Sequence, residues 1–101
     1  MGTRLNLQTL LETLLGSKNV YFQPPPSFIM QYPCIVYSLN NIKTDHADNR
    51  PYNLKKRYAI TVIDSNPDSI LIDKISVLPA CSFERAFTAD KLNHTVFNIY
   101  Y

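Results

Sequence analysis

Residues 17–101 contain no glycine, because both glycines of the sequence, Gly2 and Gly16, lie near its start. Glycine supplies the backbone freedom on which tight turns and phosphate-binding loops depend. The sequence therefore lacks the glycine-rich phosphate loop, the dinucleotide fingerprint and the glycine-flanked nucleophile elbow of hydrolases. We expect turns built from asparagine, aspartate and proline, no nucleotide-dependent catalysis and no bound cofactor.

Chain length and net charge further limit the classes of protein to which the sequence can belong. The chain has 101 residues, enough for one hydrophobic core and one domain covering residues 1–101. A domain of this size has little material left to enclose a deep active site, so we expect a binding or structural protein and not an enzyme. The formal net charge of +2 is well below that of a dedicated nucleic-acid binder. With no apolar run of membrane-spanning length and no signal-peptide pattern, the chain should stay in the cytoplasm.

Two segments have the periodicity of amphipathic helices. The first begins after a capping Thr3 and ends at Gly16, and its apolar residues recur at helical spacing: Leu7, Leu10, Leu11 and Leu14. The second spans residues 67–78, ends at Pro79 and presents an apolar stripe of Leu71, Ile75 and Leu78. Its start is predicted from capping chemistry at Ser65, Asn66, Pro67 and Asp68.

The remaining apolar segments are typical of strands. They are residues 20–22, 32–39, 52–64, 81–89 and 95–101. The three prolines at residues 24–26 exclude a helix or a central strand and predict a crossing loop or a sheet edge. We expect Asn40 and Asn41 to end one strand and residues 90–94 to form a turn. The predicted fold is α+β, an antiparallel sheet of about four strands with two helices packed on one face, in the order α-β-β-β-α-β-β.

Residues 43–50 are polar and are expected to form a long exposed hairpin loop. Two sets of side chains were considered as metal ligands: Cys34, His46, Cys81 and His94, and the local set Asp45, His46 and Asp48. Neither has the paired spacing of a structural zinc site, so no metal is predicted. Cys34 and Cys81 are interpreted as reduced core thiols, and His94 as bonding the backbone of the turn before the last strand.

Aromatic residues are abundant, with seven tyrosines and five phenylalanines in the chain. In the last predicted strand, Phe97, Ile99 and Tyr101 fall on one face, and Val96 and Tyr100 on the other. A sheet covered by helices on one side leaves its other side open, which predicts an oligomer with Tyr100 and Tyr101 at contacts. A cluster of cations at residues 55–57 could contact phosphate, but alternation along a strand prevents all three from facing one way.

Four stretches of the sequence resemble the tail-completion or tail-terminator proteins of long-tailed bacteriophages. They are YPCIVY at residues 32–37, DNRPY at residues 48–52, RYAITVID at residues 57–64 with PDS at residues 67–69, and FTADKLNHTVF at residues 87–97. The resemblance runs through nearly the whole chain in order, and it carries over no catalytic residue.

The resemblance implies a structural virion protein assembled in the host cytoplasm. Such proteins form a ring, generally a hexamer, that caps the tail tube and docks it to the head-side connector or stopper protein, with double-stranded DNA passing through the channel. It also implies that residues 43–50 reach toward a neighbouring subunit or ring through Lys43, Asp45, His46, Asp48, Asn49 and Arg50. The alternatives are another neck or head-completion component, or a small nucleic-acid-binding module that uses Lys55, Lys56 and Arg57.

Overall fold

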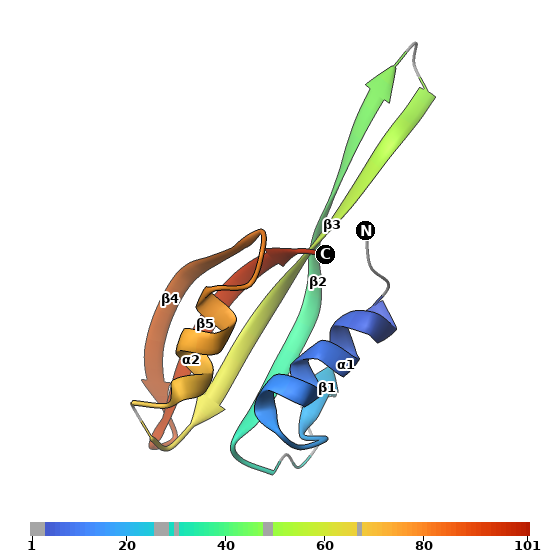
Figure 1. Cartoon of the computed structure of the whole chain (residues 1–101). Helices are drawn as coiled ribbons and strands as arrows, with labels where there is room; N and C mark the ends of the chain where they lie inside the picture. The colour runs from blue at the N-terminus through green and yellow to red at the C-terminus, as the bar shows by residue number, and fades with distance from the viewer. Residues whose placement is uncertain (1–3, 26–28, 30, 48–49, 67) are drawn as a thin grey trace.

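The computed structural model describes residues 4–25, 29, 31–47, 50–66 and 68–101, and along residues 43–47 and 50–55 it describes the course of the backbone. The elements are α1 (Arg4–Leu15), β1 (Val20–Phe22), β2 (Cys34–Ala47), β3 (Arg50–Asp64), α2 (Ile70–Ser76), β4 (Cys81–Ala89) and β5 (Leu92–Tyr100). This succession confirms the predicted order α-β-β-β-α-β-β (Figure 1). No described helix is long and apolar enough to cross a membrane.

The fold is α+β with a five-stranded mixed sheet in the order β1-β2-β3-β5-β4. The predicted all-antiparallel sheet of about four strands is therefore wrong, because β1 adds to the edge of the sheet parallel to β2. The N–H of Ile35 donates to the carbonyl of Asn19 at 3.0 Å, and the N–H of Gln23 donates to the carbonyl of Tyr37 at 3.0 Å. Parallel neighbours need a long crossover connection, which residues 23–33 supply here.

The hydrophobic core joins both helices to the sheet. Leu7 and Leu11 of α1 and Leu71 and Ile75 of α2 are buried in one cluster with residues of the strands. The strand residues of that cluster are Val20, Ile35, Tyr37, Tyr58, Ile60, Val62, Phe97 and Ile99. The register places Tyr37, Ile60 and Phe97 side by side across β2, β3 and β5. We call the face of the sheet that carries these three residues the core face, and the opposite face the second face.

Helix α1 follows its sequence closely, whereas α2 is shorter than predicted. Thr3 lies outside the described residues, and Gly16, at φ 79°, ends α1 as expected. The predicted start of α2 at residues 65–68 is wrong: Asp64 accepts a hydrogen bond from the N–H of Asn66, and Asn66 accepts one from the N–H of Asp68, each at 3.0 Å. These bonds hold the segment in turns, so the helix is capped only at Ser69. Pro67 lies outside the described residues.

The turn between β4 and β5 is tighter than predicted. It consists of Asp90 and Lys91, with φ of 52° and 64°, so β5 begins at Leu92 and not at residue 95. Positive φ at both central residues is the geometry of a two-residue hairpin that matches the twist of the strands. Aspartate here takes a role usually given to glycine, as expected.

A polar contact ties α1 to the sheet within this core. The hydroxyl of buried Tyr37 donates to Gln8 Oε1 at 2.5 Å and accepts a bond from Arg4 at 3.3 Å. Burial raises the pKa of Tyr37, and the hydrogen bond from Arg4 opposes that rise. The Arg4 guanidinium also lies 4.7 Å from the centre of the Phe22 ring. The start of α1 is thereby fixed over β1 and β2.

Leu11→Ala should lower the free energy of unfolding by about 2–5 kcal/mol, because Leu11 is fully buried and its removal leaves a cavity. The matched control is Leu5→Ala on the same helix, where the side chain is 65% exposed and the expected change is below about 0.5 kcal/mol. Urea denaturation of both variants measures the difference. Equal effects would contradict the packing of α1 on the sheet.

Candidate interaction surfaces

The β2–β3 hairpin continues far beyond the body of the domain. β1 pairs with β2 only over residues 35–37, and β5 pairs with β3 only up to Arg57. Beyond the pair Asn41 and Arg57, as far as the pair Ala47 and Arg50, the two strands pair only with each other in the described sheet. We call residues 41–47 and 50–57 the hairpin arm. Figure 1 shows it projecting from the sheet, and it contributes to a long axis of 51 Å against 29 and 23 Å.

The arm corrects the predicted exposed loop at residues 43–50. Lys43, Asp45 and His46 lie in β2, and Arg50 begins β3. Strand pairing continues here because the main-chain hydrogen bonds of a ladder do not require an apolar side chain at alternate positions. Lys43 is opposite Lys55, Asp45 opposite Asn53, and His46 opposite Pro51. Asp48 and Asn49 lie outside the described residues.

The two tyrosines proposed as contact residues lie at the base of the arm. Tyr100 is opposite Arg57 in the register and is 38% exposed. Tyr101 is partly buried against the core, and its N–H donates to the carbonyl of Lys56 at 3.0 Å. The structure thus brings the chain end to the root of the arm, while the residues of the predicted loop lie further along it.

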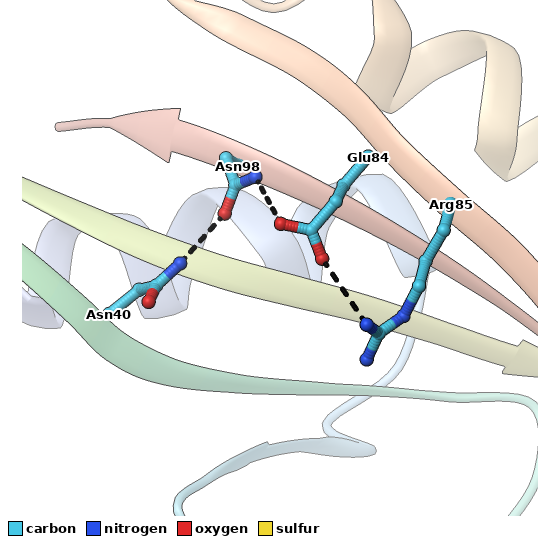
Figure 2. Close-up of polar contacts among 4 residues, drawn as sticks. All are labelled: Asn40, Glu84, Arg85 and Asn98. Carbon is cyan, nitrogen blue, oxygen red and sulfur yellow. Dashed lines mark hydrogen bonds and ion pairs between the residues drawn. The ribbon is translucent and has the colours of Figure 1, made fainter.

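A polar network crosses the second face near the arm (Figure 2). The Asn40 amide donates to Asn98 Oδ1 at 3.0 Å, and the Asn98 amide donates to Glu84 Oε1 at 2.8 Å. Glu84 is also 3.9 Å from the guanidinium of Arg85. Between Asn40 and Asn98 lies β3, where the residue opposite Asn98 is Ala59, whose small side chain leaves room for the two amides. The network therefore links β2, β5 and β4.

Two β-bulges create this network. The register shifts between Leu39 and Asn41 in β2, which leaves Asn40 as an extra residue, and between Phe83 and Arg85 in β4, which leaves Glu84 extra. A bulge re-aims side chains by adding one residue to one strand. Asn40 was predicted to end its strand, and the structure shows that the strand continues through it to Ala47. Sequence reasoning missed the network because a bulge leaves no regular residue pattern.

Away from the arm, the second face carries both buried and exposed side chains. Cys34, Ile63 and Val96 are buried there, outside the main core cluster. Phe87 stacks on His94 with ring centres 4.7 Å apart, and the Arg85 guanidinium lies 5.6 Å from the centre of the Phe87 ring. His94 Nδ1 lies 3.2 Å from the carbonyl of Leu92, so the predicted contact with the backbone is present, but it lies within β5 and not in the turn.

Three kinds of feature among the described residues bear on catalysis and metal binding: hollows, groups of ligating side chains and free thiols. Among the described residues, one hollow of about 240 Å³ is lined by Leu10, by residues 78–80 after α2 and by the chain end, and another of about 220 Å³ lies beside His94. Within the described part of the chain, no group of three or more His, Cys, Asp and Glu residues could hold a metal ion. Cys34 and Cys81 are free thiols, as predicted, and burial raises the pKa of each.

A scan of protein-family models and searches of curated proteins and of solved structures gave no significant match. The function must therefore be argued from the residues and geometry of the chain itself. The features available for that argument are the hairpin arm, the polar network and the exposed outer strand β4.

Cys34 should make the fold sensitive to alkali. Burial raises the pKa of its thiol from 9.0 to about 11. The unfolded chain loses this proton first, so stability present below pH 9 is lost as pH rises toward 11, by about 2–3 kcal/mol. Urea denaturation between pH 8 and 11 should show this decline, and Cys34→Ala should remove that part of it. Identical pH profiles for both proteins would contradict the assignment.

Proposed function

We propose that the chain is a structural virion protein, a tail-terminator or tail-completion subunit that assembles with copies of itself into a ring at the end of a phage tail tube. The four sequence stretches that resemble this family support the proposal. In this arrangement both helices pack on the core face, the ring meets the tail tube protein on one side and the head-side connector or stopper protein on the other, and double-stranded DNA passes through its centre.

The observation that carries the proposal is the hairpin arm. A two-stranded ribbon is marginally stable in water unless a further strand, a helix or another chain covers it. Over the described residues, neither helix and no third strand accompanies the arm beyond Arg57. The radius of gyration of 14.7 Å exceeds the roughly 13 Å expected for a compact domain of this length. A neighbouring subunit that receives the arm supplies the missing cover.

An arm on one subunit and a receiving surface on the next make a heterologous contact. Such contacts, when the rotation closes, give rings of identical subunits. The family resemblance adds that residues 43–50 reach toward a neighbour, and this stretch lies within the arm. The ring and its hexameric copy number remain proposals that rest on the arm and the resemblance together.

A nucleic-acid-binding module is the second candidate, because Lys55, Lys56 and Arg57 follow one another along β3. Two observations weigh against it. Lys56 and Arg57 are half-buried, and Arg57 Nε is a buried nitrogen with no hydrogen-bond partner among the described residues. Phosphate contacts need exposed cations, and each contact makes binding weaken with salt. Titration with double-stranded DNA at two salt concentrations separates the candidates, since micromolar, strongly salt-dependent binding would favour the second.

The ring predicts a fixed copy number. Quantitative mass spectrometry of purified particles of the encoding phage should find the chain at about six copies, with a capsid protein of known copy number as the internal standard. A neck or head-completion component would also be found in the particle, and an image of the assembled neck would assign its position. Absence of the chain from purified particles would overturn the proposal.

Lys43→Glu should impair assembly without harming the fold. Lys43 lies in the arm, outside the core cluster, so the reversal should change the free energy of unfolding of the free chain by less than about 0.5 kcal/mol. Copy number in particles should nevertheless fall. Lys91→Glu, the same charge change in the β4–β5 turn, is the matched control and should assemble normally. A Lys43→Glu monomer that melts several degrees lower would show that the arm serves folding instead.

A further inference from the structure

The outer strand β4 is an unpaired sheet edge. It is the last strand of the sheet order, has nine residues and exposes every side chain between Cys81 and Ala89. The opposite edge, β1, has three residues. Long edges with apolar side chains invite pairing with another chain, and proteins often protect them with proline, charged residues or a bulge. β4 contains no proline or lysine, its two charges and its bulge lie together at Glu84 and Arg85, and its Phe83 and Phe87 are 61% and 43% exposed.

The bulge at Glu84 changes which residues of β4 share a face. Before it, Cys81 and Phe83 are opposite Ile99 and Phe97 and therefore lie on the core face. After it, Ala86 and Thr88 lie on the core face, because they are opposite Thr95 and Asn93, alternate neighbours of Phe97 along β5. The second face accordingly receives Ser82 and Glu84 before the shift and Arg85 and Phe87 after it.

This change of alternation selects one way for β4 to pair with a second copy of itself. In an antiparallel pair, directly opposite residues must lie on the same face of the joined sheet. In a regular strand, such self-pairing joins residues separated by an even number of positions. Across the bulge, residues separated by an odd number of positions share a face instead. In one antiparallel register, both members of every opposite pair therefore lie on the same face: Glu84 with Arg85, Phe83 with Ala86, Ser82 with Phe87, and Cys81 with Thr88.

We propose that β4 pairs antiparallel with β4 of a second copy, about a twofold axis between Glu84 and Arg85. The charges of the strand are complementary in this register, because each Glu84 is opposite Arg85 of the other copy. Both side chains lie on the second face: the Asn98 amide donates to Glu84 at 2.8 Å (Figure 2), and the Arg85 guanidinium lies 5.6 Å from the centre of the Phe87 ring. Opposite charges directly across a strand pair stabilise it, and the axis makes two such pairs.

The twofold pair concerns the free protein and goes beyond the proposed ring. Subunits related by this axis point in opposite directions, whereas every subunit of a ring on a tube end points the same way. The dimer must therefore separate before such a ring forms. The two proposals can fail independently, because one is tested on the purified chain and the other on assembled particles.

The register is tested with a single added cysteine. In Thr88→Cys, the new thiol is opposite the native Cys81 of the second copy, at a separation that suits a disulfide. Mild oxidation of the purified protein should give a covalent dimer that a reducing agent separates. The matched control is Ser82→Cys, which adds an exposed thiol opposite Phe87 and should give no more dimer than the wild type.

The outcomes separate this proposal from its competitors. The hairpin arm contains no cysteine, so a copy that covered β4 with its arm would leave Thr88→Cys without a disulfide partner. A wild-type dimer that Thr88→Cys does not trap would therefore overturn the proposal. Equal trapping by Ser82→Cys would assign a different register, and a monomer that no variant traps would show an unpaired edge.

Charge reversal tests the pairing without any covalent bond. Glu84→Arg and Arg85→Glu should each raise the dissociation constant of the dimer at least about tenfold. Each substitution places like charges opposite one another on both sides of the twofold axis. An equimolar mixture of the two variants restores both opposite-charge pairs and should form heterodimers in analytical ultracentrifugation. The double swap Glu84→Arg with Arg85→Glu should dimerise as the wild type does. Undiminished dimerisation of either single variant would contradict the proposed contact.

Discussion

The antiparallel ladder between β2 and β3 is the constraint on which the rest of the structure depends. Its inner part is buried: Ile35 and Tyr37 are opposite Val62 and Ile60, and these residues join the core that both helices complete. Its outer part continues the same hydrogen-bonded pairing into the arm, where no other described element follows it. One ladder, shifted in register by bulges, thus connects the covered body of the domain to a ribbon that no other described element follows, and this difference underlies the proposed contact with a partner chain.

Much of the body could be predicted because hydrophobic burial dictates its sequence. Leu7 and Leu11 at helical spacing predicted α1, and alternation of Tyr58, Ile60 and Val62 predicted the inner part of β3. The arm could not be found in this way. Outside the core a strand has no buried face to keep apolar, so its residues show no alternation and resemble a loop. Residues 20–22 were predicted as a strand, but their parallel pairing with β2 was not. Val20 and Phe22 do face the core, yet three residues are too few to indicate which strand they pair with or in which direction.

The polar network was equally hidden from the sequence. Asn40 had been assigned to the end of a strand because asparagine favours turns, but main-chain pairing on both sides of it converts the extra residue into a bulge. Its amide then reaches Asn98, and Asn98 reaches Glu84 on a strand two positions further across the sheet. Only the three-dimensional register brings these side chains together, since no local spacing in the sequence connects them.

The bulge in β4 follows from a conflict between the turn and the core. The two-residue turn at Asp90 and Lys91 sets the register of the hairpin, with Thr88 opposite Asn93. Continued without a shift, that register would place Glu84 opposite Phe97 on the core face and turn Phe83 away from it. Inserting one residue reverses the assignment, so Phe83 meets Phe97 in an edge-to-face contact at 6.0 Å and the carboxylate moves to the second face. The burial of Phe97 thus determines where the charges of β4 lie, and through them the one register in which this edge can pair with its own copy.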